Sequence, residues 1–321
     1  MKKILIIIFC IWAAMFITGL ALDRQYKIYW RPVFEKFDGV FKDSTGRDIV
    51  LEGDSRVHLG INPYYIDSVT GLNSFNSGLG GASVDEMYLL TRSWLKNHRV
   101  PKLFVVSINY AGMRANRKLL ENPCYYLFYS SDPLVSDLLD SAHFHTALFR
   151  LFPMLKYTVF DEYNKVSIIR SLKGDRFLLP GGISYKGFFN NAAGTSFRDD
   201  PNASYIDTPN TTRASFETGL NKFGQLLEMI HSSGSRCFIV YPPCYNYKRI
   251  HNNIPLCDYL DEKIAGFAGN YNDPVIHYDT DSSFTPGCFQ DPWHLNIFGS
   301  VIYSKKMSED IKRIFPDIVQ K

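Results

Sequence analysis

A serine, a histidine and an aspartate of this chain have the types and spacing that acyl-transfer chemistry requires. Ser55 closes the tripeptide Gly53–Ser55, and Asp291 precedes His294 by three residues, a spacing that lets the two side chains meet on a turn. The carboxylate of Asp291 would fix the tautomer of His294, and the other imidazole nitrogen could then take the proton of the Ser55 hydroxyl. We therefore predict Ser55 as nucleophile, His294 as general base and Asp291 as the residue that orients the imidazole.

Further groups near these residues could stabilise the negative charge that develops on an acyl oxygen. Backbone N–H groups at the start of a helix after Ser55 would point toward such an oxyanion. The glycine-rich segment Asn76–Ser83 lets the backbone approach a substrate closely, and the side-chain amide of Asn109 can donate a hydrogen bond.

Each of these motifs lies where a predicted strand ends or the last predicted helix begins. Apolar runs predict strands over 48–52, 72–76, 103–108, 237–241 and 275–278. Capping signals and helical spacing predict helices over 83–99, 216–234, 256–267 and 297–311. Strands that alternate with helices form a parallel sheet covered on both faces, and ligands bind at the carboxyl ends of its strands. The chain is therefore predicted to be an α/β protein of three α/β/α layers, with a mostly parallel five-stranded sheet.

The alternation breaks between about 111 and 213, where we predict a large inserted cap. This stretch holds the aromatic run Cys124–Tyr129, a helical segment around 144–160 and a glycine- and asparagine-rich loop over 181–202. Both flanks belong to one sheet, so the stretch is an insertion rather than a separate domain. Its aromatic residues could stack on sugar rings, but they are better explained as the core of the cap itself.

An apolar N-terminal run predicts export of the rest of the chain. Lys2 and Lys3 precede 19 apolar residues, Ile4–Leu22, nearly enough to cross a hydrocarbon core of about 30 Å. Residues 1–22 are predicted as a signal anchor or signal peptide, and 23–321 as the main domain. We favour an uncleaved anchor, which gives a single-pass protein of the cell membrane with an extracytoplasmic domain. Cleavage after the small residues Gly19–Ala21 would give a secreted or periplasmic protein.

Composition excludes several other classes. Lys and Arg number 35 against 32 Asp and Glu, so the chain has no concentrated basic footprint for nucleic acid. Hydrophobic residues make up 45%, which is ample for a core. The six cysteines form no C-x-x-C pair, so a zinc site has no support, and one or two disulfides outside the cytoplasm remain open.

The motifs together resemble the conserved blocks of the SGNH/GDSL hydrolase superfamily. Gly53–Ser55 resembles the first block, and Asn76–Ser83 resembles the second. The resemblance implies that the N–H groups of Ser55 and Gly81 and the amide of Asn109 form the oxyanion hole.

Asp291 and His294 match the last block of the superfamily. The resemblance covers about 48–110 and 213–321 and implies a flavodoxin-like SGNH fold without a metal or organic cofactor. Two departures are Arg56, which stands where the GDSL name has Leu, and Tyr110, which follows Asn109 where the family has Asp.

The anchor and the insertion make the chain resemble membrane-anchored members that transfer or remove acyl groups on bacterial polysaccharides. This implies a serine-dependent esterase or acyltransferase acting on O-acyl groups of a cell-envelope polysaccharide. The partners to expect are an acylated glycan or small acyl ester, the membrane and envelope-biosynthesis proteins. The alternative is a non-catalytic envelope binding or assembly protein that keeps the fold.

Remaining polar residues near the motifs are weaker candidates. Arg56 could bind an anionic substrate group, although a salt-bridged arginine explains it as well, and Trp293 is the aromatic residue best placed for the site. His58 is predicted on the surface of the first helical turn. His143 and His145 would point to different faces of a helix, so we predict no metal there.

Overall fold

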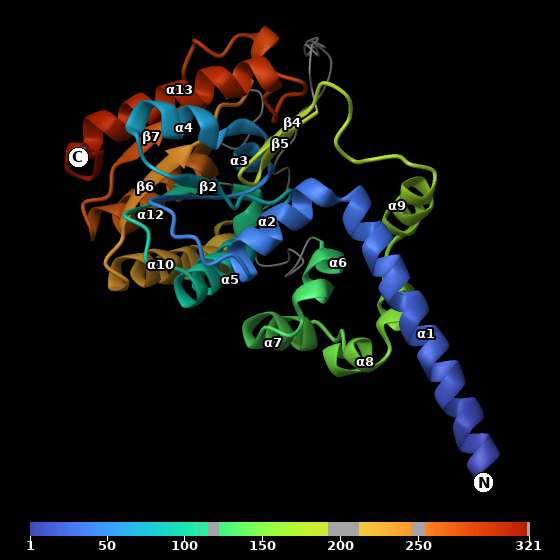
Figure 1. Ribbon diagram of the computed structural model, residues 1–321. Helices are drawn as coiled ribbons and strands as arrows, with labels where there is room; N and C mark the ends of the chain where they lie inside the picture. Colours follow the sequence, from blue (N-terminus) through green and yellow to red (C-terminus); the bar gives the residue numbers. More distant parts are fainter. Residues whose placement is uncertain (109, 115–121, 192–211, 246–253, 320–321) are drawn as a thin grey trace. The chain divides into compact units, whose positions relative to one another are not determined.

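The computed structural model describes the chain except residues 109, 115–121, 192–211, 246–253 and 320–321, and it divides into two compact units (Figure 1). The first, here called the N-terminal unit, combines Met1–Phe37 with Asn122–Leu179. The second, called the sheet unit, combines Asp38–Glu121 with Pro180–Lys321. These boundaries differ from the predicted ones, because the N-terminal helix and much of the predicted cap form one unit.

The sheet unit contains a five-stranded parallel sheet in the order β2-β1-β3-β6-β7. In chain order this is 2-1-3-4-5, the order of flavodoxin-like sheets. The predicted α/β class and parallel sheet are confirmed, with strand ends shifted by at most two residues. The strands are β1 (Ile49–Glu52), β2 (Ser74–Asn76), β3 (Leu103–Ser107), β6 (Arg236–Tyr241) and β7 (Val275–His277).

Helices cover both faces of the sheet (Figure 1). Successive side chains of a strand point to opposite faces, so the buried strands β1 and β3, and β6 after its exposed first residue, need apolar partners on both sides. One face packs on α3, α4 and α13, and α5, α10 and α12 lie on the other (Figure 1). The sheet-unit helices are α3 (Ser55–Gly60), α4 (Pro63–Thr70), α5 (Val84–Asn97), α10 (Glu217–Ser232), α12 (Ile254–Gly269), α13 (Ile297–Ile314) and α14 (Pro316–Val319).

Local signals account for the helices that were predicted. Ser83 Oγ accepts a hydrogen bond from Glu86 N at 3.2 Å, and the Glu86 carboxylate accepts one from Ser83 N at 3.0 Å, which is the predicted capping box of α5. The stripe of α10, from Leu220 through Ile230, is buried as predicted.

A β-hairpin corrects the first part of the loop predicted over 181–202, and residues 192–202 of that loop lie outside the described residues. Strands β4 (Ile183–Tyr185) and β5 (Phe188–Asn190) pair in antiparallel fashion within the sheet unit. Lys186 and Gly187 between them both have positive φ, at 45° and 84°, as the turn of a two-residue hairpin requires. Gly187, one of several glycines in the predicted loop, belongs to this turn.

The core of the N-terminal unit is aromatic. Helix α1 (Lys2–Tyr29) continues seven residues beyond the apolar run, and its last turns pack on rings of the second segment. Tyr26 stacks on Phe128 with centroids 5.4 Å apart, and Trp30 lies 4.3 Å from Phe177. The aromatic run thus forms a core jointly with α1, rather than a core of the cap alone. The other elements are α2 (Arg31–Phe41, which continues into the sheet unit), α6 (Pro123–Tyr126), the 3₁₀ helix η2 (Leu127–Tyr129), α7 (Pro133–Ser141), α8 (Thr146–Leu151), the 3₁₀ helix η3 (Pro153–Thr158) and α9 (Glu162–Leu172).

The structure also corrects the predicted helix around 144–160 and answers the question of disulfides. The helical segment expected around 144–160 is divided between α8 and η3, because Pro153 starts a new helical segment after Phe152. All six cysteines are free, and five of them are buried. The disulfides left open by the sequence are therefore not formed.

Candidate active site

Ser55 is the first residue of α3, directly beyond the carboxyl end of β1. Asp54 caps the helix, because its side chain accepts a hydrogen bond from Arg56 N at 3.0 Å. This strand-turn-helix arrangement leaves the half-buried Ser55 at the edge of the sheet, where ligands of parallel α/β folds bind.

His294 and Asp291 complete a hydrogen-bonded chain with Ser55. Ser55 Oγ lies 2.7 Å from His294 Nε2, and His294 Nδ1 lies 2.8 Å from one Asp291 oxygen and 3.0 Å from the other. Asp291 Oδ1 also accepts hydrogen bonds from the backbone N–H groups of Trp293 and His294, at 2.8 and 2.9 Å. The carboxylate therefore fixes both the loop that carries His294 and the orientation of its ring. The structure thus brings together three residues predicted from motifs more than 230 positions apart.

The environment of Asp291 keeps its carboxyl group ionised. Burial acts to raise the pKa of Asp291, but the hydrogen bond and charge of His294, with the two backbone donors, outweigh burial and lower it below the usual value. An ionised carboxylate is the form that accepts the Nδ1–H proton and stabilises an imidazolium ring.

The glycine-rich segment is attached closely to the turn that carries Ser55. Leu79 N donates to Gly53 O at 3.0 Å, and the buried Asn76 amide donates to the carbonyls of Val57 and Ile61 at 2.8 and 2.7 Å. Gly78 is required here, since a Cβ would lie 2.8 Å from the Val57 side chain and 2.9 Å from His58 N.

Of the two other predicted oxyanion donors, the structure describes Gly81 but not Asn109. Gly81 has φ of 72°, a conformation that favours glycine, in the loop before α5. Asn109 lies outside the described residues. Its neighbour Ile108 ends the β3 segment with a hydrogen bond from its N–H to Val240 O at 2.8 Å.

Arg56, a predicted substrate-binding residue, is engaged within the protein. Its guanidinium pairs with Asp54 at 3.2 Å and donates to Ile108 O at 3.0 Å, and its side chain is only 12% exposed. These contacts join the first turn of α3 to the end of β3, so they favour the salt-bridged alternative over a ligand contact.

The two aromatic neighbours of the triad lie differently from each other. Trp293 is half-buried in the His294 loop. His58 is buried, which corrects its predicted surface position, and its ring lies 3.9 Å from the Phe189 ring in an edge-on arrangement. Phe189 belongs to β5, so the hairpin covers this side of α3.

Asn190 is a functional candidate that the sequence analysis missed. Its side chain is fully buried, and its amide donates to Leu59 O at 2.9 Å and to Leu295 O at 3.0 Å. Leu59 belongs to the helix that begins at Ser55, and Leu295 follows His294. One amide group therefore joins the backbone segments that carry the nucleophile and the base. Asn190 is one of several asparagines in this segment, and nothing in the local sequence indicates its role.

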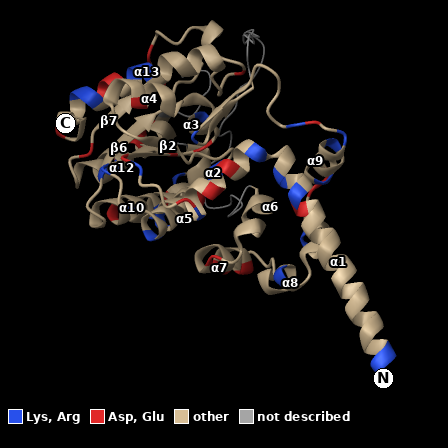
Figure 2. Ribbon diagram, in the orientation of Figure 1, with Lys and Arg blue, Asp and Glu red and all other residues tan. Residues whose placement is uncertain are grey.

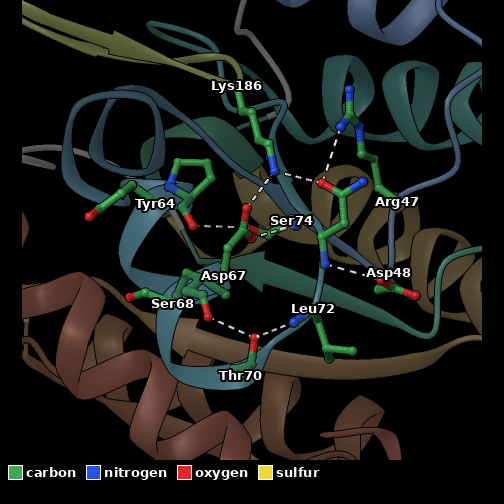
Figure 3. A network of polar contacts seen from close by, with 12 residues as sticks. Arg47, Asp48, Tyr64, Asp67, Ser68, Thr70, Leu72, Ser74 and Lys186 are labelled. Atoms are coloured by element: carbon green, nitrogen blue, oxygen red, sulfur yellow. Dashed lines mark hydrogen bonds and ion pairs between the residues drawn. The ribbon is translucent and has the colours of Figure 1, made fainter. Parts of the chain in front are cut away.

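The hairpin that carries Asn190 is fixed at its turn as well. Figure 3 shows Lys186 reaching to Asp67 of α4. Lys186 Nζ also donates to the amide oxygen of Asn73 at 2.7 Å. Asp67 also accepts a hydrogen bond from Ser74 N at 2.7 Å, at the start of β2. The backbone adds a hydrogen bond from Asn76 N to Lys186 O at 3.0 Å. Asn190 therefore extends from a hairpin that is attached to both the sheet and α4.

Among the residues that the structure describes, no group of three or more His, Cys, Asp or Glu side chains could hold a metal ion.

Comparison with known proteins gives similarity at the level of solved structures. A GDSL-like lipase from Bacteroides thetaiotaomicron aligns at 10% identity and a TM-score of 0.42, over 90% of this chain and 100% of its own. An acetyl xylan esterase aligns at 11% identity and a TM-score of 0.42, over 82% and 99%. A catalytic mutant of an acetylxylan esterase from Geobacillus stearothermophilus aligns at 10% and 0.39, over 84% and 96%.

No family model and no curated protein matches the chain. The aligned structures named above are a GDSL-like lipase and two acetyl xylan esterases. With identities of about one residue in ten, the function has to be argued from this chain's own site.

Proposed function

We propose that this chain is a serine-dependent esterase or acyltransferase that acts on O-acyl groups of a cell-envelope polysaccharide. The observation that carries the proposal is the hydrogen-bonded chain from Ser55 Oγ through His294 to the Asp291 carboxylate. A serine hydroxyl is a weak nucleophile unless a base within hydrogen-bond reach takes its proton. His294 is at that distance, and Asp291 holds its other nitrogen.

The reaction proceeds in two steps. Ser55 Oγ attacks the acyl carbonyl while His294 Nε2 takes its proton, and the imidazolium ring is stabilised by Asp291. His294 then gives the proton to the leaving sugar oxygen, which departs and leaves an acyl-serine ester. Water, or the hydroxyl of an acceptor, next loses its proton to His294 and attacks this ester. The proton returns to Ser55, and the product is a free acid or a new ester.

The oxyanion of each tetrahedral intermediate needs fixed hydrogen-bond donors. We assign the backbone N–H groups of Ser55 and Gly81 and the amide of Asn109 to this task, each worth about 3 kcal/mol in the transition state. Arg56 is assigned to positioning, because its contacts hold the turn that presents Ser55 N–H. Trp293 remains our candidate for contact with the substrate.

Helix α1 supports the location of this activity at a membrane. Among the described residues it is the one helix that is long and apolar enough to cross a bilayer, although a signal sequence near an N-terminus passes the same test. Figure 2 shows α1 without charged residues between Lys3 and Asp23. Cleavage after Ala21 would remove Trp12 and Gly19, which pack on the second segment of the N-terminal unit. These contacts favour the uncleaved anchor.

The test uses the full chain in detergent micelles, with p-nitrophenyl acetate and an O-acetylated polysaccharide as substrates. Acetate release is expected from the parent protein, and it should be lost in Ser55→Ala and His294→Ala. Ser68→Ala is the matched control, because Ser68 is an exposed serine of α4 outside the site. Formation of a new ester on an added sugar acceptor would identify a transferase.

Two outcomes would contradict the proposal. Hydrolysis that persists in Ser55→Ala would exclude Ser55 as the nucleophile. Folded parent protein without turnover on either substrate class, with or without acceptor, would instead favour the binding or assembly role.

A further inference from the structure

We propose that the segment formed by α8 and η3, Thr146–Thr158, enters the hydrocarbon of the bilayer beside α1, so that lipid acyl chains cover its exposed apolar side chains. The inference rests on the proposed anchoring of the chain by α1. It adds a second membrane contact, made by residues more than 120 positions from the anchor.

The apolar run of α1 is barely long enough to cross a bilayer. The 19 residues Ile4–Leu22 extend about 28 Å as a helix, and the hydrocarbon core is about 30 Å thick. A run that is barely long enough must lie inside the membrane over its whole length. Residues that pack against the middle of the run therefore cannot remain in water.

The α8–η3 segment contacts α1 at positions from Trp12 to Asp23. Trp12 Nε1 donates to Leu151 O at 3.1 Å, and Gly19 lies so close to Pro153 that a Cβ would come within 2.8 Å of it. Asp23, just past the run, accepts hydrogen bonds from Lys156 Nζ at 2.7 Å and Tyr157 Oη at 2.6 Å. Residues 12, 19 and 23 share one helical face. The segment therefore follows α1 from about the middle of the run to its end.

Side-chain chemistry along the segment changes in step with this depth. Leu151 and Met154, where the segment contacts the apolar run, are 57% and 40% exposed in the protein alone, and Leu148, one turn earlier in α8, is 49% exposed. Apart from Arg150, the charged and phenolic groups of the segment are those of Lys156 and Tyr157, at the level of Asp23, where the polar interface would begin. Apolar surface that is exposed at hydrocarbon depth and polar groups at the interface are the pattern of a membrane-embedded surface.

The backbone and the one charged residue of the deep part are also compatible with lipid. Leu151 ends α8, and its carbonyl oxygen accepts the Trp12 indole N–H, so this helix-end group has a donor at a depth without water. Arg150 is exposed, and its long side chain can reach toward the polar interface. Lipid is the occupant because the bilayer that surrounds α1 must surround whatever packs on its exposed flank.

The test measures depth in the membrane with the full chain in phosphatidylcholine–phosphatidylglycerol vesicles. Leu151→Cys, in a Cys10→Ser background, is labelled with an NBD fluorophore, and the other cysteines are buried. Quenching is measured with phosphatidylcholine that carries a doxyl group near the middle of its acyl chain. Cys10 labelled in the parent chain reports the anchor itself.

A matched control comes from the same unit. Leu172 of α9 is 66% exposed, but its neighbour Ser171 donates to Gln25, beyond the end of the apolar run. Leu172→Cys is therefore expected to resist quenching by the deep doxyl group. Leu151→Cys is expected to lose as large a fraction of its fluorescence as Cys10.

The outcomes separate the inference from the anchor. Quenching at Cys10 but not at Leu151→Cys would overturn the inference and leave α1 as an anchor, and a blue-shifted but unquenched probe would mean that protein covers this surface. Equal quenching at Leu172→Cys would also overturn it, since depth would not follow the contacts with α1. A lack of quenching at all three positions would remove the anchor and the inference together.

Discussion

Each of the two units has its own kind of internal contact. In the sheet unit, buried amide side chains bind backbone carbonyls near the proposed catalytic residues, as Asn76 and Asn190 do. In the N-terminal unit, rings pack around Tyr26 and Trp30 beside an apolar helix. Hydrogen bonds fix direction and distance, which a reacting site needs, whereas packed rings supply apolar area with looser geometry. In the sheet unit, buried directional hydrogen bonds therefore fix the segments that carry the proposed catalytic residues, whereas the N-terminal unit combines packed rings with polar contacts such as Asp23–Lys156.

The largest effect is expected from removing the hydrogen bonds between the Asp291 carboxylate and His294. Asp291→Asn should lower kcat by about 10⁴-fold, because an amide can leave His294 in the wrong tautomer. The melting temperature should change far less than the rate. Rates of ester hydrolysis measure this effect, and Asp281→Asn, a carboxylate outside the triad, is the control. A loss below about tenfold would mean that His294 does not depend on Asp291.

The lowered pKa of Asp291 also sets the pH range of its contribution. A depressed pKa means that the stabilisation is fully present above the unfolded value of about 3.9 and is lost as pH falls through the folded value. The stability difference between parent and Asp291→Asn should therefore be constant from pH 5 to 8 and shrink in stronger acid. A difference that shrinks already between pH 7 and 5 would contradict this assignment.

The next effect concerns the N-terminal unit. Lys156→Met should destabilise this unit by about 3 kcal/mol, because it leaves the Asp23 carboxylate without its cation in a largely buried setting. Arg31→Met, which breaks an exposed pair with Glu35, should cost less than about 1 kcal/mol. Limited proteolysis and melting curves in detergent measure both. Equal losses of stability in the two variants would show that the buried pair Lys156–Asp23 stabilises the unit no more than the exposed pair Arg31–Glu35.

Asn190→Ala is expected to have a smaller effect, on rate as well as stability. Loss of the two bonds to Leu59 O and Leu295 O frees the segments that carry Ser55 and His294, and misplacement by about 1 Å can cost about 10²-fold in rate. We expect kcat to fall 10- to 100-fold with little change in KM, together with about 1–3 kcal/mol of stability.

Asn73→Ala is the matched control for this positioning role. The substitution removes the side-chain oxygen that accepts from Lys186, at the turn of the hairpin, and from Arg47, which precedes β1. Because these contacts lie away from Ser55 and His294, it should cost stability without the same loss of kcat. A parallel decrease in stability and kcat for both variants would make Asn190 structural only.

The smallest effect lies at the carboxyl end of β7. The hydrogen bond to Asp279 raises the pKa of His277, with burial opposing it and the charges of Asp279 and Asp261 adding to it. A raised pKa gives stability that is fully present below about pH 6.5 and lost as pH rises through the folded value. His277→Gln should therefore lower the melting temperature more at pH 6 than at pH 9. Because the imidazole is 41% exposed, we expect less than about 1 kcal/mol, and equal effects at both pH values would contradict the assignment.

The same contrast explains what the sequence could predict. The strands of the sheet and helices such as α5 have local signals, namely apolar runs and a capping box, and these predictions are confirmed. Ser55 and His294 lie 239 residues apart, yet their positions at the edge of a parallel sheet made their meeting predictable.

What the sequence missed depends on contacts without a local pattern. Asn190 reaches carbonyls 131 and 105 residues away, and Tyr26 donates to Asn164 across 138 residues. The strands of the hairpin that turns at Lys186 and Gly187 have three residues each, too few to show a period. Their positions follow from tertiary packing rather than from propensity.

The central claim, an activated serine held by a directional chain, is tested most directly with a fluorophosphonate probe on the full chain in detergent. We predict a single adduct whose labelled peptide contains Ser55, with labelling lost in Ser55→Ala, strongly slowed in His294→Ala and retained in Ser68→Ala. Labelling of folded Ser55→Ala at the parent rate, or an adduct mapped to another serine, would contradict the account.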